Sequence, residues 1–328
     1  MKSFQLDIEV TRGEVAESRH RVHAAVVGDD TLIGAARDPE AFTFWRSCAK
    51  PFQIMPLIES GGFDRLGWGD DKLALACASH TGEPEHVALA QSMLDDIELE
   101  EGDLACGPHD PLSARGRKLL RECGATLTRL HNNCSGKHAA MLARARDEGW
   151  SHRGYHLEGH PVQQAILATV SHWSGVPAAQ IRRAVDGCGV VVFGLPLTAM
   201  ARAWARLAAS AARGEEPARQ IAHAMRTQPF LVGGSDRFDT VLIEETHGRV
   251  LAKVGAEGIH SVAILDAGIG LAVKVEDGAA RAQHPAVLRL LQYLGALPDT
   301  LPARLAPFLR SPVHDTRRME VGEIRPVA

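Results

Sequence analysis

The chain has 328 residues, of which 45% are hydrophobic and 23% charged, and its formal net charge is −4. These proportions are ordinary for a globular protein with a sizeable core, and without a run of Lys and Arg they give no sign of a nucleic-acid-binding surface. No uninterrupted apolar stretch of about 18 residues occurs, so we expect no membrane span and a cytoplasmic location. In that compartment the six cysteines should be mostly reduced.

Both ends of the sequence predict strands, and the middle predicts helices. Alternating apolar residues bounded by turn residues indicate seven strands: Phe4–Val10, His20–Val27, Thr31–Ala36, Thr240–Glu245, Arg249–Lys253, His260–Leu265 and Gly270–Val275. Runs with helical periodicity indicate six helices: Ala49–Ser60, Glu83–Leu94, Lys137–Glu148, Val162–Ser174, Leu197–Arg213 and Pro217–Thr227.

The short connections between the late strands imply antiparallel pairing. We therefore expect one domain, residues 1–328, of the α+β class, with an antiparallel sheet built from both chain ends and flanked by helices. The sheet part should cover about 1–45 and 235–328, and a mostly helical part about 46–234. The chain lacks the alternating βαβα pattern of a Rossmann fold or a TIM barrel.

The segment Arg46–Lys50 contains the pattern S-x-x-K at the start of a predicted helix. A spacing of three places Ser47 and Lys50 on one helical face, where a neutral lysine can take the proton of the serine. Ser79 precedes a later helix and Lys253 ends a late strand, although an N-cap serine and an exposed lysine would also explain these two positions. In this order the three elements match the layout of serine β-lactamases and penicillin-binding proteins. Val254 replaces the usual Thr, so the pattern favours that fold more than a penicillin-directed activity.

Two further segments, 131–138 and 186–189, each place one cysteine among residues suited to tight turns. Two thiolates, from Cys134 and Cys188, would bind a soft or borderline cation. Lys137 lies one helical turn after Cys134 and can ligate a metal only after it loses its proton. The alternative is a pair of buried cysteines that behave as small apolar side chains.

With these motifs the sequence resembles the type II L-asparaginases of the rhizobial kind, over nearly the whole chain. The motifs are Arg46–Pro51, Ala78–Glu83, His131–His138, Asp186–Gly189 and Lys253–Gly258. The resemblance implies a serine β-lactamase-like fold, a homodimer, and hydrolysis of L-asparagine to L-aspartate and ammonia. It also implies a zinc ion and a catalytic set, with Cys134, Lys137 and Cys188 as metal ligands and Ser47, Lys50, Ser79 and Lys253 as catalytic residues.

In the expected mechanism Ser47 attacks the amide, Lys50 takes its proton, and Ser79 relays a proton to the leaving ammonia with help from Lys253. The sequence leaves open which serine attacks first. Candidate substrate contacts are Arg46 for the α-carboxylate and Asp186 or Glu83 for the α-ammonium, with His80 and His138 as hydrogen-bonding groups around the site.

Other activities remain open, namely a glutaminase, a D-amino-acid amidase or a peptidase on the same fold, or a non-catalytic zinc- or ligand-binding protein. The intact Ser–Lys set argues against the last, since a binding protein needs no lysine beside a serine. The small side chains of the Ala-rich segment 199–213 give weak physical support to a homodimer, because they allow close helix packing.

Overall fold

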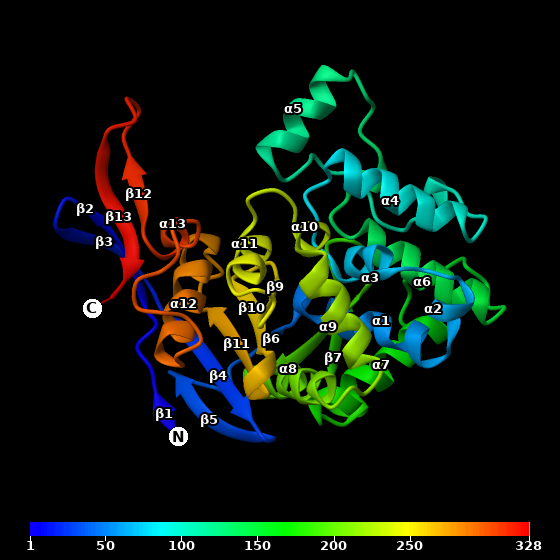
Figure 1. Cartoon of the computed structure of the whole chain (residues 1–328), viewed down its shortest axis with the longest axis horizontal. Helices are drawn as coiled ribbons and strands as arrows, with labels where there is room; N and C mark the ends of the chain where they lie inside the picture. Colours follow the sequence, from blue (N-terminus) through cyan, green and yellow to red (C-terminus); the bar gives the residue numbers. More distant parts are fainter. Residues whose placement is uncertain (328) are drawn as a thin grey trace. The chain divides into compact units, whose positions relative to one another are not determined.

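The structure is a computed structural model that describes residues 1–327, and the chain forms two compact units (Figure 1). The first, here the sheet unit, comprises residues 1–48, 195–209 and the chain from 241 onward. The second, here the helical unit, comprises residues 49–194 and 210–240. Residues 195–209, which the sequence analysis placed in the helical part, thus belong with the sheets.

A six-stranded sheet in the order β1-β5-β4-β11-β10-β9 is built from both ends of the chain. Its strands are β1 (Lys2–Ser3), β4 (Val22–Gly28), β5 (Thr31–Ala36), β9 (Val250–Val254), β10 (Ile259–Ile264) and β11 (Ile269–Val275). The two chain ends meet where β4 pairs antiparallel with β11, from Val22 opposite Val275 to Gly28 opposite Ile269. The predicted mixed class, with one sheet drawn from both termini, is confirmed; only the short β1 pairs in parallel.

A second sheet, in the order β12-β13-β2-β3, was not predicted. It consists of β2 (Ile8–Arg12), β3 (Val15–His20), β12 (Ser311–His314) and β13 (Glu320–Pro326), and the predicted strand Phe4–Val10 overlaps only β2. Helix α12 (Ala280–Tyr293) contacts β10 and β11 of the first sheet and β2 and β13 of the second, and α13 (Ala306–Leu309) packs on α12. The sheet unit therefore buries α12 against strands of both sheets.

The predicted strand Thr240–Glu245 is wrong, because these residues belong to helix α11 (Phe238–Glu245). Phe238, Val241 and Leu242 are all buried, and their spacing of three and four residues puts them on one helical face. A short apolar run cannot be assigned by its periodicity alone, and here the helical face includes Phe238, which lies outside the predicted strand.

Helix α8 (Leu197–Ala212) packs closely on β11 through its small side chains. A Cβ atom added at Gly270 of β11 would lie 2.1 Å from the Ala205 nitrogen and 2.2 Å from the Ala201 carbonyl oxygen. Only glycine leaves room for this approach between helix and strand backbones. The small face of the Ala-rich helix is thus used inside the chain, so it no longer supports a dimer.

The helical unit is organised around α6 (Ser135–Asp147), which is buried along most of its length and contacts several other helices. Its helices are α1 (Lys50–Glu59), α2 (Gly62–Arg65), α3 (Asp70–Cys77), α4 (Pro84–Asp95), α5 (Ala114–Glu122), α7 (Pro161–Ser174), α9 (Ala218–Thr227) and α10 (Pro229–Val232). A Cβ added at Gly136 would lie 2.4 Å from the Leu75 carbonyl oxygen, so the start of α6 lies directly against the end of α3. This contact brings two of the sequence motifs together.

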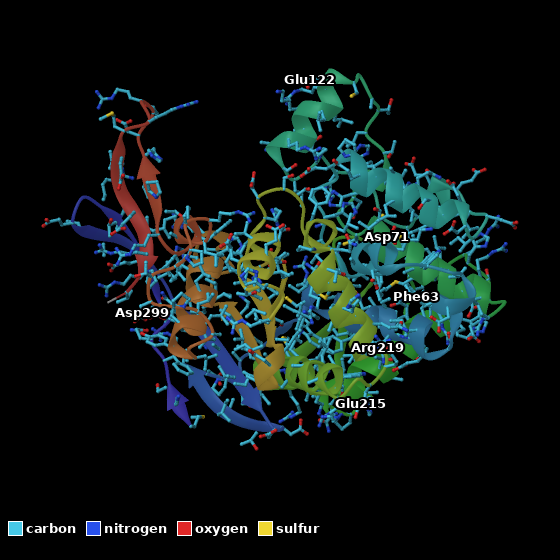
Figure 2. All side chains as sticks on the ribbon, viewed as in Figure 1. Phe63, Asp71, Glu122, Glu215, Arg219 and Asp299 are labelled. Atoms are coloured by element: carbon cyan, nitrogen blue, oxygen red, sulfur yellow. The ribbon has the colours of Figure 1, made fainter. Side chains whose placement is uncertain are left out.

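The remaining elements are short. They are the strand β6 (Phe42–Phe44), the antiparallel pair β7 (Arg182–Val185) and β8 (Val191–Pro196), and the 3-10 helices η1 (Arg46–Ala49), η2 (Glu101–Asp103), η3 (Arg129–His131), η4 (Ala178–Gln180) and η5 (Leu265–Ala267). Helix α5 projects from the rest of the helical unit, and Glu122 lies at its free end (Figure 2). None of the helices formed by residues 1–327 combines the length and hydrophobicity needed to cross a bilayer.

Candidate active site

Lys50, the first residue of α1, is fully buried in the helical unit. Its Nζ atom lies 3.1 Å from the hydroxyl of Ser79 and 3.1 Å from the carbonyl oxygen of Asn133, and it also donates to the carbonyl of Ala78. These three oxygens match the three N–H donors of an ammonium group. Lys50, which the sequence pattern paired with Ser47, therefore contacts the second serine of the predicted set.

The segment Ser79–Glu83 is held by the backbone on both sides. The amide of Ser79 donates to the carbonyl of Val232 at 3.1 Å, and the amide of Leu112 donates to the carbonyl of Thr81 at 2.9 Å. Gly82 has a φ of +69°, and a Cβ there would lie 2.8 Å from the carbonyl oxygen of His131. Glycine is thus required at the turn that follows the serine, on both conformational and steric grounds.

His80 is a buried, neutral hydrogen-bonding residue. Its Nδ1 accepts from the amide of Gly82 at 3.1 Å, so Nε2 carries the proton and donates to the hydroxyl of Ser135 at 2.9 Å. That hydroxyl in turn donates to the carbonyl of Leu130 at 3.0 Å. Burial, reinforced by neighbouring positive groups, lowers the pKa of His80 well below its usual value. The imidazole links the serine segment to the start of α6.

Glu83 is the N-cap residue of α4, and its side chain is fully buried. Its carboxylate accepts from the Thr81 hydroxyl at 2.8 Å, from the amide and hydroxyl of Ser235 at 3.1 and 2.9 Å, and from the Arg115 guanidinium. Burial raises the pKa of this carboxyl, but the hydrogen bonds outweigh it and lower the pKa to about 2. Glu83 is therefore ionised, with both oxygens engaged by the protein.

The predicted metal ligands meet in one buried cluster. Cys134 is the N-cap residue of α6, Lys137 lies in its first turn, and Cys188 lies in the turn between β7 and β8. Lys137 Nζ donates to Cys188 Sγ at 3.0 Å, and the Cys134 thiol donates to the side-chain oxygen of Asn133 at 3.2 Å. The half-buried Asp186 adds a negative field at Lys137. The start of α6 and the turn between β7 and β8, which are far apart in the sequence, therefore meet in this cluster.

Charge is shared unequally within this cluster. The neighbouring Cys134 and the charge of Lys137 lower the pKa of Cys188, although burial alone would raise it. The neighbouring Cys188 and burial raise the pKa of Cys134. Burial opposes a charge on Lys137, but the two sulfur atoms outweigh it and raise its pKa. These directions favour a Cys188 thiolate paired with a Lys137 ammonium.

This donor set fits zinc, because two sulfurs and one amine nitrogen lie together in a buried place, and zinc prefers sulfur and nitrogen ligands. Zinc binding would require the thiol of Cys134 and the ammonium of Lys137 to lose protons. Among residues 1–327, no group of three or more His, Cys, Asp and Glu side chains is placed to hold a metal ion, so the set depends on Lys137 as its third ligand.

Asn133 joins the Lys50 pair to the cysteine cluster, a role that the sequence analysis missed. Its carbonyl oxygen accepts from Lys50, while its side-chain oxygen lies 3.2 Å from Cys134 Sγ. Its amide donates to Nε2 of His109 at 2.9 Å. The only signal in the sequence was the pair Asn132–Asn133 before the cysteine, which indicates a turn but not a main-chain contact with a lysine.

His138 follows the cluster in α6 and is fully buried. Its Nδ1 lies 2.5 Å from the hydroxyl of Tyr155, which also accepts from the amide of Ala105 at 2.9 Å. The hydroxyl proton therefore goes to Nδ1, and Nε2 carries the imidazole proton without a partner in the described chain. Burial, together with the charge of Lys137, lowers the pKa of His138 well below its usual value.

In the sheet unit, the segment that carries Ser47 is anchored on the neighbouring strands. The indole nitrogen of Trp45 donates to the hydroxyl of Ser261 on β10 at 3.1 Å. The thiol of Cys48 donates to the carbonyl of Lys253 on β9 at 3.0 Å. Ser47 is half-buried between these two anchors. Its backbone is therefore fixed beside the strand end that carries the predicted catalytic lysine.

Arg46 and Lys253 complete the predicted set in the sheet unit. Arg46 has a φ of +53°, a left-handed conformation that is uncommon for a residue with a Cβ. Lys253 is fully buried, and its Nζ donates to the carbonyl of Val254 at 2.9 Å. A Cβ at Gly255 would lie 2.4 Å from Cγ2 of Ile259 and 3.1 Å from Cys48 Sγ, which explains the glycine after this strand.

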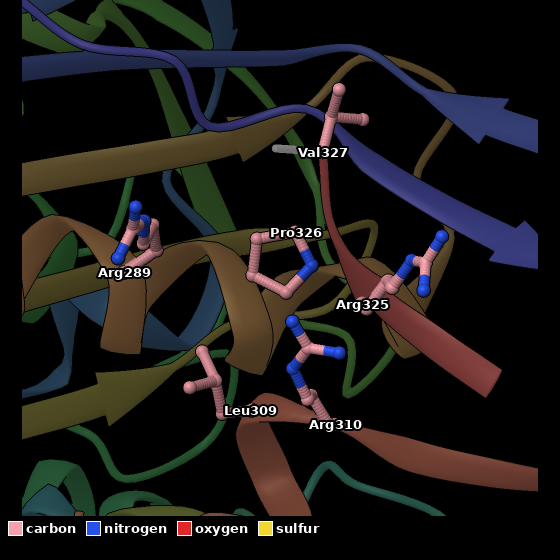
Figure 3. Close-up of a pocket in the computed structure, with 6 residues that line it drawn as sticks. All are labelled: Arg289, Leu309, Arg310, Arg325, Pro326 and Val327. Atoms are coloured by element: carbon pink, nitrogen blue, oxygen red, sulfur yellow. The ribbon is translucent and has the colours of Figure 1, made fainter. Parts of the chain in front are cut away.

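Two cavities lie outside the predicted set. A cavity of about 350 Å³ in the sheet unit is lined by Arg289, Leu309, Arg310, Arg325, Pro326 and Val327 (Figure 3). Glu323 pairs with Arg310 and Arg325, which reduces the positive charge there. A more apolar cavity of about 470 Å³ lies between α4 and α5 of the helical unit. Neither contains a predicted catalytic residue or metal ligand.

A sequence model of the L-asparaginase II family matches residues 8–326. No individual curated protein matches at a significant level. Similar solved structures include native Mglu (14% identity, TM-score 0.45, 85% of this chain and 66% of that chain) and a putative beta-lactamase from Bacteroides dorei DSM 17855 (11%, 0.42, 83% and 94%). The octameric penicillin-binding protein homologue from Pyrococcus abyssi is similar at 11% identity and a TM-score of 0.34, over 84% and 73%. The chain spans just under two thirds of the length of Mglu, and these structures are too distant to assign an activity.

Proposed function

Because the chain belongs to the L-asparaginase II family, we propose that it is an amidohydrolase that converts L-asparagine to L-aspartate and ammonia through a serine–lysine mechanism. The observation that carries the mechanism is the buried contact of 3.1 Å between Lys50 Nζ and Ser79 Oγ. A serine hydroxyl becomes a useful nucleophile only when an adjacent base takes its proton, and a lysine can do so once it is neutral.

In the proposed reaction a serine oxygen attacks the side-chain amide carbon, and its proton passes to a lysine. The amide nitrogen then takes up a proton and leaves as ammonia, and water hydrolyses the acyl-enzyme to release aspartate. Ser47 is the proposed nucleophile with Lys50 as its base, and Ser79 relays the proton with help from Lys253. The contact between Lys50 and Ser79 also supports the reverse order, with Ser79 as the attacking group.

The substrate also carries two charged groups, an α-carboxylate and an α-ammonium, that the protein must bind. Arg46 is the proposed partner of the α-carboxylate, because a guanidinium binds carboxylates in a bidentate manner. Asp186 is the proposed partner of the α-ammonium, and its position near Lys137 would place that contact next to the cysteine cluster. His80 and His138 supply neutral hydrogen-bonding groups around the site rather than bases.

Zinc is part of the proposal, with Cys134, Lys137 and Cys188 as its protein ligands. When bound it would supply a positive charge that fixes polar groups of the substrate or of the site. The protein side chains perform the proton transfers. The finer assignment, a rhizobial-type zinc asparaginase that works as a homodimer in the cytoplasm, also belongs to this proposal and rests on the sequence motifs.

The test is a coupled assay for ammonia with asparagine, glutamine and a penicillin as separate substrates. We expect release from asparagine and a slower reaction with glutamine, because one extra methylene costs about 1–3 kcal/mol of transition-state binding in a fitted pocket. Rapid penicillin opening, or turnover of glutamine alone, would replace this proposal by another hydrolase activity. Light scattering at micromolar concentration would show whether the protein is a dimer.

A further inference from the structure

Glu83 gathers donors from three separate segments of the helical unit. Thr81 belongs to the serine segment, Arg115 lies in α5, and Ser235 lies in the loop between α10 and α11. The carboxylate is buried and ionised, whereas nearby Glu85 shares the same arginine at 2.7 Å but is 47% exposed. A surface ion pair of the Glu85 kind contributes little, while a buried carboxylate with four donors fixes its partners strongly.

The loop that carries Ser235 is fitted tightly to the serine segment. Gly234 has a φ of +119°, and an added Cβ would lie 2.0 Å from the Thr81 hydroxyl oxygen. The carbonyl of Val232, the last residue of α10 before this loop, accepts from the amide of Ser79. The loop between α10 and α11 and the Glu83 carboxylate therefore both contact the segment Ser79–Glu83.

The position of the Ser79 hydroxyl is important because Lys50 can donate to several acceptors. Its contact with the Ser79 hydroxyl competes with carbonyl oxygens of Ala78 and Asn133. A small shift of the serine segment would leave Lys50 bonded to carbonyls and lengthen its distance to the hydroxyl. Displacements of about 1 Å can cost about 10²-fold in rate.

We propose that Glu83 is a positioning residue, which holds Ser79 against Lys50 through Thr81 and Ser235 and does not bind the substrate α-ammonium. The inference rests on the proposed asparaginase function, and it replaces the substrate contact that the sequence suggested for Glu83. Glu83 is the acceptor in all four of its hydrogen bonds. The side-chain NH2 group of a glutamine at this position is a donor, so it would face the Arg115 or Ser235 donors and could not accept from them.

The kinetic test compares Glu83→Gln with the control Glu85→Gln, which loses only the exposed half of the Arg115 contact. We expect Glu83→Gln to lower kcat by about 10- to 100-fold with KM for asparagine within about twofold, and Glu85→Gln to stay near wild type. Ser235→Ala, which removes one donor, should lower kcat in the same direction by less. A raised KM with unchanged kcat, or wild-type kinetics, would overturn the inference.

Succinamic acid, which is asparagine without its α-amino group, separates positioning from substrate binding. If Glu83 positions Ser79, Glu83→Gln should slow asparagine and succinamic acid by the same factor. If it binds the α-ammonium, the variant should lose its preference for asparagine, since only that substrate loses a contact. This second outcome contradicts the inference.

Hydrogen exchange gives a readout that needs no turnover. In the substrate-free protein we expect the amides of 79–83 and 233–236 to exchange faster in Glu83→Gln than in wild type or Glu85→Gln. Unchanged protection would exclude the positioning role. If the wild type releases no ammonia from asparagine, the proposed function fails, while the exchange data still decide whether Glu83 holds the serine segment.

Discussion

At the level of single residues, Lys50 is placed by oxygen atoms and not by a neighbouring carboxylate. Its partners are the main-chain carbonyls of Ala78 and Asn133 and the hydroxyl of Ser79, and the hydroxyl is the only one of the three that can give up a proton. We therefore expect Lys50→Met and Ser79→Ala each to lower kcat by roughly 10²-fold or more, and the double variant to be little worse, because the pair acts as one unit. Steady-state ammonia release measures this.

The control for that prediction is Lys72→Met, since Lys72 pairs with Asp96 away from the predicted catalytic residues and should leave kcat unchanged. Thermal unfolding of each variant shows whether the fold is kept. Turnover near the wild-type rate in Ser79→Ala would exclude Ser79 from the chemistry and leave the contact with Lys50 as a packing feature.

The ionisation of Glu83 predicts how stability depends on pH. Its pKa is about 2 in the folded protein, against about 4.3 in an unfolded chain. A depressed pKa contributes stability that is fully present above the unfolded value and is lost as the pH falls toward the folded value. In urea unfolding, the advantage of wild type over Glu83→Gln should thus be constant above about pH 5 and shrink from there to pH 3.

A difference between the two proteins that stays the same down to pH 3 would contradict this, because it would mean that the variant acts through shape alone. Buried, neutral His80 and His138 add acid sensitivity to both proteins equally, since their pKa values are lowered and the unfolded chain gains protons below about pH 6.5. The comparison removes that shared part.

At the level of elements, the close packing of α8 on β11 depends on Gly270, which has no Cβ atom. Gly270→Ala would place a Cβ 2.1 Å from backbone of Ala205, which neither element can relieve by a rotamer change. We expect a loss of about 1–3 kcal/mol or more in the free energy of unfolding, as for overpacked cores. Denaturant unfolding of Gly270→Ala against wild type measures it.

Gly28→Ala is a matched control on the adjacent strand. Its added Cβ would meet side-chain atoms of Ile33 and Ile269 at 3.4 and 3.5 Å, which is ordinary contact. The control should change stability by much less than Gly270→Ala. Equal losses in the two variants would show that strand glycines matter here for backbone reasons and not for the approach of the helix.

The burial of a strand or helix decides whether the sequence predicts it. Strands β4, β10 and β11 are almost wholly buried, and their apolar runs between turn residues were recognised. Strands β3 and β13 are largely exposed or half-buried, so they carry no apolar alternation, and pairing between remote segments decides their structure. Helix α11 was assigned wrongly because its apolar run is too short to show a period.

The site shows the same division between local and remote information. Lys50, Ser79, Cys134 and Lys137 stand in short motifs whose chemistry is readable from neighbouring residues. The partners of Glu83 are not readable, because Arg115 and Ser235 lie 32 and 152 positions away and belong to no motif. The contact of Asn133 with Lys50 uses a main-chain carbonyl, which every residue type has, so the sequence cannot indicate it. Local motifs therefore identify the chemistry, and the tertiary fold supplies its support.

At the scale of the whole molecule, a zinc ion would tie distant parts of the helical unit together. Cys134 and Lys137 lie at the start of α6, and Cys188 lies about fifty residues later in the turn between β7 and β8. A ligand that binds only the folded state raises the free energy of unfolding by mass action. We expect one zinc per chain by elemental analysis, and a chelator that lowers the Tm of wild type but not of Cys188→Ser.

Lys137 is the decisive ligand, because an ammonium cannot bind a metal. If all three side chains bind, zinc displaces protons from Cys134 and from Lys137 while Cys188 is already a thiolate, so about two protons should be released per zinc near neutral pH. Calorimetry in buffers of different ionisation enthalpy counts them. Release of one proton, with zinc retained in Lys137→Ala, would leave Lys137 as a nearby cation. Zinc-free wild type that keeps full activity and an unchanged Tm after chelation would return Cys134 and Cys188 to the role of buried thiols.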